Sequence, residues 1–252
     1  MNQIPISPGG HLITKKDQNY TINFSRVMLA LSTSQLKGGI NEIESCFNHQ
    51  LTKWIGTVDD LPNSSIKDYL YETSAELNLD PETTTGLMTT ASMDNASIEW
   101  AQDDNISIFA VITGGAGVNA VRSGDLPCYH EHFPDKFTPI GGTINILLVI
   151  EAKLPPETLA RIAIIATEAK TAALQDLSIK SCFSEGLATG TGTDGLIIAC
   201  HKEDPIIFTD SGNHSKLGYL ISTIVKRGVA SSIIKEQEAY EKRKSEEDKN
   251  AE

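Results

Sequence analysis

The sequence has few cysteines and no regular spacing between them. The four, Cys46, Cys128, Cys182 and Cys200, include no CxxC pair. Neither a zinc ribbon nor a disulfide framework is therefore indicated, and we expect the thiols to be reduced.

Long hydrophobic runs and an excess of positive charge are also missing. The longest apolar run, INILLVI at 144–150, is too short to span a bilayer. The first residues, MNQIPISPGGHLITKK, lack a charged start followed by an apolar core, so they do not resemble a signal peptide. The net charge is −12, and no basic patch stands out that could offset it on a phosphodiester backbone. We expect a cytoplasmic protein that uses neither membranes nor nucleic acid.

The composition that is present suits one soluble domain. The chain has 252 residues, of which 40% are hydrophobic and 21% charged. We expect a single domain over 1–232, followed by a charged, partly disordered tail over 233–252, where apolar periodicity is lost and charges alternate in sign.

The hydrophobic patterns predict an α/β (α+β) protein, with a mixed or largely antiparallel sheet layered with helices. Strands are expected at 23–33, at 195–200, around 205–212, and in the runs TTTGLMTTASM, ISIFAVITG and GTINILLVIEA. Helices are expected at 40–51, 64–78, 156–177 and from 215 onward.

A turn rich in glycine and threonine, ATGTGTDG, precedes the strand expected at 195–200. Its glycines, Gly190 and Gly192, let backbone N–H groups approach a ligand, and its hydroxyls belong to Thr189, Thr191 and Thr193. A phosphate loop would continue into a helix, whereas this turn continues through Asp194 into a strand. The turn either faces a ligand that carries oxygen atoms or is a structural hairpin.

A second polar segment, TDSGNHSKLG, places His214 just before the last helix. The positive end of a helix favours the neutral form of histidine, which could act as a base. The alternative is that His214 or Ser215 caps the helix.

A third segment, TGGAGVNAVRSGD, lacks the GxGxxG spacing of a dinucleotide loop. Asn119, Arg122 and Asp125 offer an amide, a cation and a carboxylate within seven residues. The alternative is a solvated loop with a local Arg–Asp pair.

Lys170 falls within the apolar face of the helix expected at 156–177. A buried ammonium is costly without a partner. Lys170 must therefore extend past small alanines to solvent or meet a carboxylate such as Asp194 or Asp125.

The loop LPCYHEHFPDKFTP contains Cys128, His130, Glu131 and His132, which are residue types that suit a soft metal or a corrinoid cobalt. Without a distant fourth ligand the run has no fixed geometry. An ordinary surface insertion is the alternative.

Several segments in a fixed order resemble the adenosylcobinamide amidohydrolase family of corrinoid salvage. They are LALSTSQLKGGI with FNHQL, TTGLMTTASM, TGGAGVNAVRSGD, GTINILLVIEA, ATEAKTAALQDL, ATGTGTDG and SGNHSKLG, which together span about residues 27–220. The resemblance implies hydrolysis of the amide that joins the aminopropanol arm to the corrin ring, with adenosylcobyric acid and 1-amino-2-propanol as products. Cobalt would enter only within the substrate, so no separate cofactor or metal is expected.

Two positions depart from the family pattern. The PCYHEHFPDKFTP insertion is longer than the family pattern, which bears on substrate preference, and Ser215 stands where threonine is usual. The order of elements is also similar to αββα sandwiches of the self-processing aminopeptidase group, a likeness of fold alone.

These residues lead to a hypothesis for the catalytic site. Thr191 and Thr193 would hold the amide oxygen, His214 would move the proton, and Asp194 would orient His214 or water. Lys170 or Glu168 would tune the site electrostatically, and the nucleophile is either threonine or water. The expected substrate contacts are Thr189, Gly190, Gly192, Asn119, Arg122, Asp125, Asn145 and Ser215.

Three alternatives to this hydrolase stay open. They are a corrinoid-binding module without chemistry, an acyltransferase of the αββα type, and a metal-dependent amidase using the Cys128 loop. Assembly into a homo-oligomer is also left open.

Overall fold

The computed structural model describes residues 2–3, 9–53, 55, 58–127 and 141–250. Its strands are β1 (Asn2–Gln3), β2 (Leu12–Lys16), β3 (Asn19–Ser32), β4 (Gly39–Gln50), β5 (Thr84–Thr89), β6 (Ser97–Asp103), β7 (Ile106–Gly114), β8 (Ala120–Val121), β9 (Ile144–Lys153), β10 (Gly190–Thr191) and β11 (Gly195–His201). Its α-helices are α1 (Ile66–Glu76), α2 (Pro156–Asp176) and α3 (Lys216–Asn250). Short 3₁₀ helices are Val58–Asp60, Pro62–Ser64 and Met93–Asn95.

Strand β3 connects the two halves of a nine-stranded mixed sheet. Along one edge, its first part pairs with β2 and its last part with β11, and along the other edge it pairs with β4. The register shifts between Asn23 and Met28, which separates the two parts. One half then continues through the parallel pair β4–β5, and the other through β11, β9, β7 and β6.

Alternate residues of β9 show that the two halves pack face to face. Ile144, Ile146 and Leu148 belong to a core cluster shared with α2 and α3, whereas Leu147 and Val149 belong to a second cluster shared with β3, β4 and β5. Both faces of this strand are therefore buried, which explains its unbroken apolar sequence.

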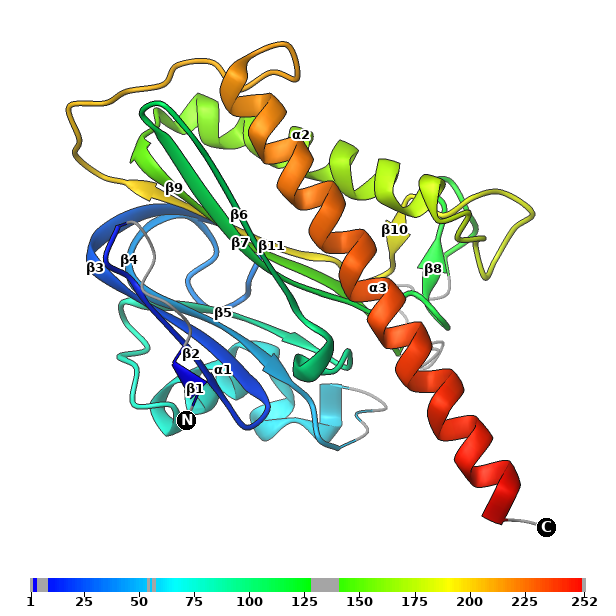
Figure 1. The fold of residues 1–252 in the computed structure, drawn as a ribbon. Helices are drawn as coiled ribbons and strands as arrows, with labels where there is room; N and C mark the ends of the chain where they lie inside the picture. Colours follow the sequence, from blue (N-terminus) through cyan, green and yellow to red (C-terminus); the bar gives the residue numbers. More distant parts are fainter. Residues whose placement is uncertain (1, 4–8, 54, 56–57, 128–140, 251–252) are drawn as a thin grey trace.

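Helices cover the outer faces of the two sheet halves. Helices α2 and α3 pack on the half that contains β6, β7, β9 and β11 (Figure 1). Helix α1 covers the other half, where Leu70 joins Phe47 of β4 in a third apolar cluster. The order of layers is helix, sheet, sheet, helix, which confirms the α/β class and the layered sheet expected from the sequence.

Helix α3 is the long final helix that the sequence predicted from 215 onward. It continues without a break past residue 232, where the domain was expected to end, and Ile233 is buried. Beyond it, Glu236 accepts a hydrogen bond of 2.6 Å from Asn95. By length and composition Lys216–Glu246 could cross a membrane, but 56% of its most apolar window is buried inside the protein, as in a core helix.

Two of the expected elements differ in the structure. Residues 40–51 show apolar residues at helical spacing, yet they form strand β4, whose pairing with both β3 and β5 overrides that local pattern. Residues 205–212 were expected to form a strand, but only Ile207 makes a bridge, to Lys153.

Candidate functional site

The interior between the two sheet halves is apolar along most of its length and polar at one end. There Asn48 of β4, Thr113 of β7 and Asn145 of β9 are almost completely buried. Asn145 Nδ2 donates to Asn48 Oδ1 at 2.8 Å, and Asn48 Nδ2 donates to Thr113 Oγ1 at 2.9 Å. Buried polar side chains need such partners, and this chain of bonds ties the two halves together at this end.

Strand β5 carries further hydroxyls to the same end. Thr85 Oγ1 lies 2.8 Å from Ser32 Oγ and donates to the carbonyl of Leu36 at 2.8 Å. Ser34 donates to the carbonyl of Gly86. These bonds fix the chain that follows β3 against β5.

The glycine and threonine turn closes this end of the interior and is organised around Asp194. Asp194 accepts hydrogen bonds from the Lys170 ammonium, from the Thr191 N–H at 3.0 Å, from the Thr191 hydroxyl and from the Ile144 N–H at 3.2 Å. With four donors the carboxylate is held in one orientation. Of the two carboxylates suggested by the sequence, Lys170 therefore pairs with Asp194.

Glycine at 190 is required by this ion pair. A Cβ atom there would lie 2.3 Å from Asp194 Oδ2 and 2.7 Å from Lys170 Nζ. Gly192 lies next to Asn119, whose Oδ1 accepts its N–H at 3.2 Å. Asn119 also donates to the carbonyl of Gly142 at 2.9 Å. Two of the predicted ligand residues thus have structural roles in shaping the turn.

A cavity of about 250 Å³ opens at this polar end. It is lined by Thr33, Ser34, Gln35, Leu51, Ile66, Leu70, Gly86, Leu87, Met88, Thr89, Thr90, Gly142, Thr143, Asn145, Thr193, Asp194 and Gly195. Among these residues Asp194 alone is charged. The exposed Thr193 hydroxyl lies at the cavity, donates to the Gly142 carbonyl at 3.2 Å and lies 3.4 Å from Asn119 Nδ2.

Most segments noted in the sequence meet at this cavity. LALSTSQLKGGI, FNHQL, TTGLMTTASM, GTINILLVIEA and ATGTGTDG line it. TGGAGVNAVRSGD and ATEAKTAALQDL support it through Asn119 and Lys170. Segments that are distant in sequence thus converge on one polar site.

His214 does not join this cluster, so its predicted partnership with Asp194 is wrong. Asp194 contacts Ile144 at the start of β9, whereas the chain leading to His214 is bonded to Lys153 at the end of β9. The neighbour of His214, Asn213, contacts Glu168 of α2, and His214 is absent from both the contacts of Asp194 and the cavity lining. In Figure 1 the start of α3 lies apart from β10.

The surroundings of His214 indicate a surface role. Its side chain is 80% exposed, and its Nε2 lies 3.3 Å from Asp210. Ser215 caps α3, because its hydroxyl accepts the Gly218 N–H at 3.0 Å. Glu168 of α2 accepts a hydrogen bond of 2.8 Å from Asn213, the residue before His214. The capping alternative for Ser215 is therefore correct.

Arg122, Asp125 and Thr189 lie beyond the cavity lining and hold the neighbouring loops. The Asp125 carboxylate accepts bonds from the Ser181 hydroxyl at 2.6 Å and from the Arg122 N–H at 2.8 Å, and the Ser181 bond is the largest of the influences that lower its pKa. Thr189 Oγ1 accepts the Ser123 N–H at 2.9 Å. The local loop structure explains these three residues.

Sequence reasoning missed Asn48, Thr113 and Thr143. Asn48 and Thr113 occupy inward positions at the ends of apolar strands, where a buried amide or hydroxyl interrupts the alternation. Thr143 donates to the Thr193 carbonyl at 2.7 Å and so connects β9 to the turn. A polar residue at an inward position of an apolar strand was the sequence signal that could have revealed Asn48 and Thr113. The Cys128, His130, Glu131 and His132 run lies outside the described residues.

A second buried polar cluster lies at the other end of β9. Glu151 Oε2 is 2.9 Å from His201 Nε2 and 3.2 Å from His11 Nε2, and His201 Nδ1 is 2.6 Å from Asp204. The ligand-type atoms of His11, Glu151 and His201 lie within 4.8 Å of one another, as in a metal centre.

The hydrogen bonds of this cluster indicate that its members share protons and do not form a metal centre. The Ser25 N–H donates to His11 Nδ1 at 3.1 Å, so the ring carries a proton on Nε2, the atom a metal would need, and that atom faces Glu151. Burial raises the pKa of Glu151, but the bonds and charges of His11 and His201 outweigh it and hold that pKa at about 2. The Glu151 bond raises the pKa of His201. A carboxylate that shares hydrogen bonds with two buried histidines therefore occupies this end.

Comparisons with known proteins agree with the sequence pattern. The sequence model of the adenosylcobinamide amidohydrolase family, CbiZ, matches residues 8–241. An uncharacterized protein of Methanocaldococcus jannaschii is 31% identical over 235 residues, which cover 89% of each chain.

Two solved structures give weaker likenesses. A protein from Pyrococcus horikoshii has a TM-score of 0.42 and 11% identity, over 88% of this chain and 82% of its own. A beta-aminopeptidase of a Burkholderia species has a TM-score of 0.40 and 12% identity, over 85% and 78%. Scores at this level carry no weight for activity. The family match, which spans nearly the whole sequence, shows that the chain belongs to the adenosylcobinamide amidohydrolase family, a family of amide hydrolases.

Proposed function

We propose that the protein hydrolyses the aminopropanol amide of adenosylcobinamide in the cavity beside Asp194. The products would be adenosylcobyric acid and 1-amino-2-propanol. The observation that carries the proposal is the convergence of the family-like segments on one polar cavity, although they are distant in sequence.

The reaction needs groups that act on the two ends of an amide. A hydroxyl or water adds to the carbonyl carbon, donors stabilise the oxygen, and the nitrogen leaves with a proton when the C–N bond breaks. The Thr193 hydroxyl lies at the cavity, where it can reach the carbonyl. Asn119, 3.4 Å from this hydroxyl, orients it.

Proton transfer is assigned to the Asp194–Lys170 pair in place of His214. Asp194 is the charged residue among those that line the cavity, and the Lys170 ammonium contacts it from α2. The pair is largely buried, with side-chain exposures of 11% for Lys170 and 18% for Asp194. A charge pair with little exposure to water exerts a stronger field on a nearby carbonyl than an exposed pair does.

Other properties follow from the proposed chemistry. The substrate is a corrinoid that brings its own cobalt, and the residues assigned here need no resident cofactor. The reaction would take place in the cytoplasm. Full activity after dialysis against a chelator is expected, whereas loss of activity would favour a metal-dependent amidase using the Cys128 loop.

A pair of threonine variants tests the assignment. Purified protein is incubated with adenosylcobinamide, and adenosylcobyric acid and aminopropanol are quantified by chromatography. Thr193→Val should lower kcat by about 100-fold or more, and Thr193→Ser should restore much of it. Thr189→Val is the matched control from the same turn, and its kcat should stay within about threefold of wild type because the Thr189 hydroxyl bonds to Ser123 of the adjoining loop and lies outside the cavity lining.

The same assay separates the rival functions. Binding of adenosylcobinamide without product formation would contradict hydrolysis and favour a binding module. A product trapped by added hydroxylamine at the expense of the free acid would favour acyl transfer. Equal kcat values for Thr193→Val and wild type would remove Thr193 from the reaction.

A further inference from the structure

A second cavity adjoins the proposed catalytic one. It measures about 320 Å³ and is lined by Thr90, Ala91, Gly115, Ala116, Gly117, Val118, Gly142, Ile233, Glu236, Gln237, Tyr240 and Glu241. Thr90 and Gly142 line both cavities, and the Gly142 N–H donates to the Thr90 hydroxyl at 2.5 Å. The two cavities therefore share one wall.

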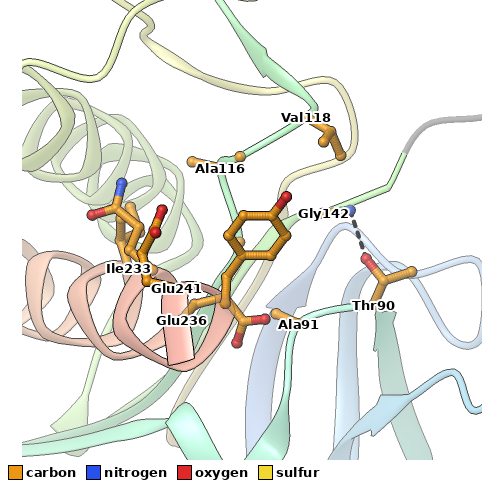
Figure 2. Close-up of a pocket in the computed structure, with 12 residues that line it drawn as sticks. Thr90, Ala91, Ala116, Val118, Gly142, Ile233, Glu236 and Glu241 are labelled. Carbon is orange, nitrogen blue, oxygen red and sulfur yellow. Dashed lines mark hydrogen bonds between the residues drawn. The ribbon is translucent and has the colours of Figure 1, made fainter. Parts of the chain in front are cut away.

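The walls of this second cavity differ from those of the catalytic one. Figure 2 shows Ala116 and Val118 on one side and Ile233, Glu236 and Glu241 of α3 on another. Val118 is 70% exposed and Tyr240 58% exposed, although both are large apolar side chains. Exposed apolar groups on facing walls of a cavity indicate a surface that a ligand covers.

Glutamate side chains and glycine backbone make the edge of the second cavity polar. Glu236 is held in place by Asn95 at 2.6 Å and the Ser92 N–H at 3.3 Å. Gly115 and Gly142 bring bare backbone to the wall, and a Cβ at Gly142 would lie 2.6 Å from the Gly115 carbonyl. The cavity therefore combines an aromatic ring, aliphatic groups and fixed acceptors.

We propose that this second cavity holds the amide-fringed edge of the corrin ring while the scissile amide occupies the cavity beside Thr193. This inference rests on the proposed function. The scissile amide of the substrate sits on a side chain of the ring, so the ring edge must lie next to the cleaved bond, as the second cavity lies next to the first. Tyr240 and Val118 contact the apolar rim, and the carboxylates of Glu236 and Glu241 accept N–H groups of the peripheral amides.

The size of the cavity agrees with this assignment. At about 320 Å³ it lies at the lower end of ligand sites, so it holds one edge of the macrocycle and leaves the rest outside. Residues 233–241 of α3 thus determine the specificity for the corrin ring.

Steady-state kinetics with matched variants test the proposal. Tyr240→Ala and Glu241→Ala should each raise the KM for adenosylcobinamide, by about 10-fold for Tyr240→Ala and about threefold for Glu241→Ala, with kcat within about twofold of wild type. The controls are Tyr219→Ala and Glu238→Ala, which are exposed on the same helix and lie outside the cavity lining. Both controls should keep the wild-type KM.

A binding experiment separates this inference from the proposed function. Equilibrium dialysis with adenosylcobyric acid, which has the corrin ring but lacks the scissile amide, followed by its visible absorption, measures binding of the ring without turnover. Weaker binding by Tyr240→Ala in a protein that forms no product would sustain the corrin site and overturn the hydrolase. Normal turnover with unchanged KM and binding in both Tyr240→Ala and Glu241→Ala would overturn the corrin site alone.

Discussion

The two ends of β9 hold polar clusters of opposite character. At one end Asp194 and Asn145 border a cavity, Lys170 pairs with Asp194, and neutral amides and hydroxyls predominate among the polar lining residues. At the other end His11, Glu151 and His201 form a tight ionic cluster whose side chains are at most 7% exposed. In the second cluster the pKa of Glu151 is lowered and that of His201 is raised, yet it is the first that has room for a substrate. Access to a cavity, more than perturbed ionisation, distinguishes the candidate site.

The difference also assigns different work to the two ends. The cavity end brings together distant segments whose hydroxyls remain available to a ligand. The ionic end joins the chain before β2 to β9 and β11 and leaves little surface for a ligand. We therefore expect substitutions at the cavity end to change kcat and substitutions at the ionic end to change stability.

The largest effect is expected for Asp194→Asn. Removing the charge leaves the Lys170 ammonium without its counter-ion and weakens the turn, so kcat should fall by about 1000-fold. Product formation from adenosylcobinamide measures it. Asp204→Asn at the ionic end is the control, and a comparable kcat loss there would erase the proposed division between the ends.

A smaller loss is expected for Gly190→Ala. The added Cβ would overlap Asp194 Oδ2 and Lys170 Nζ, so the ion pair must shift and kcat should fall by about 100-fold. Gly117→Ala is the matched control for kcat, because no atom lies within 4 Å of a Cβ at that position; Gly117 lines the second cavity, so only its kcat is compared. Wild-type kinetics in Gly190→Ala would show that the ion pair tolerates displacement.

At the ionic end, Glu151→Gln should affect stability instead of turnover. Loss of the charge that His201 faces should lower the free energy of unfolding by about 2 kcal/mol, measured by urea denaturation at pH 7. The kcat of the folded variant should stay within about twofold of wild type. A large kcat loss without destabilisation would move the active site to this end.

The stability difference between wild type and Glu151→Gln should depend on pH. Because the pKa of Glu151 is lowered from 4.5 to about 2, its contribution is complete above pH 4.5 and is lost as pH falls toward 2. The pKa of His201 is raised above 6.5, so its contribution is complete below pH 6.5 and is lost as pH rises through that raised value. Urea denaturation across this range should give a maximum near pH 5 to 6, and a flat profile would exclude the ionic network.

The smallest effect is expected for His214→Ala. The side chain is 80% exposed and lies outside the cavity lining, so kcat should stay within about twofold of wild type. The product assay measures it beside Asp194→Asn. A loss approaching that of Asp194→Asn would restore His214 to the mechanism.

Part of the site could be predicted from local sequence. ATGTGTDG is a turn because small residues are crowded before an apolar strand, and Lys170 needed a partner because its helical face is otherwise apolar. Both features depend on neighbours within one element. The partner of Lys170 could not be chosen from the sequence, which gives no reason to prefer Asp194 over Asp125. The packing of α2 against the turn brings Asp194 to Lys170.

Other features depended on contacts that sequence spacing does not encode. His214 and Asp194 are only twenty residues apart, but β11 and the segment after it carry the chain to Asp210, the partner of His214, outside the cavity lining. Residues 40–51 have helical spacing, but two neighbouring strands supply their hydrogen bonds.

The sequence by itself determined the layered α/β class, the polar turn and the family, because these follow from periodicity, small residues and motifs that are read locally. The tertiary structure decided which polar groups share a cavity, which ones are sealed in an ionic cluster, and which helix covers the second cavity. The physical reason is that burial and electrostatic environment are properties of neighbours in space, and the fold of the sheet on itself selects those neighbours.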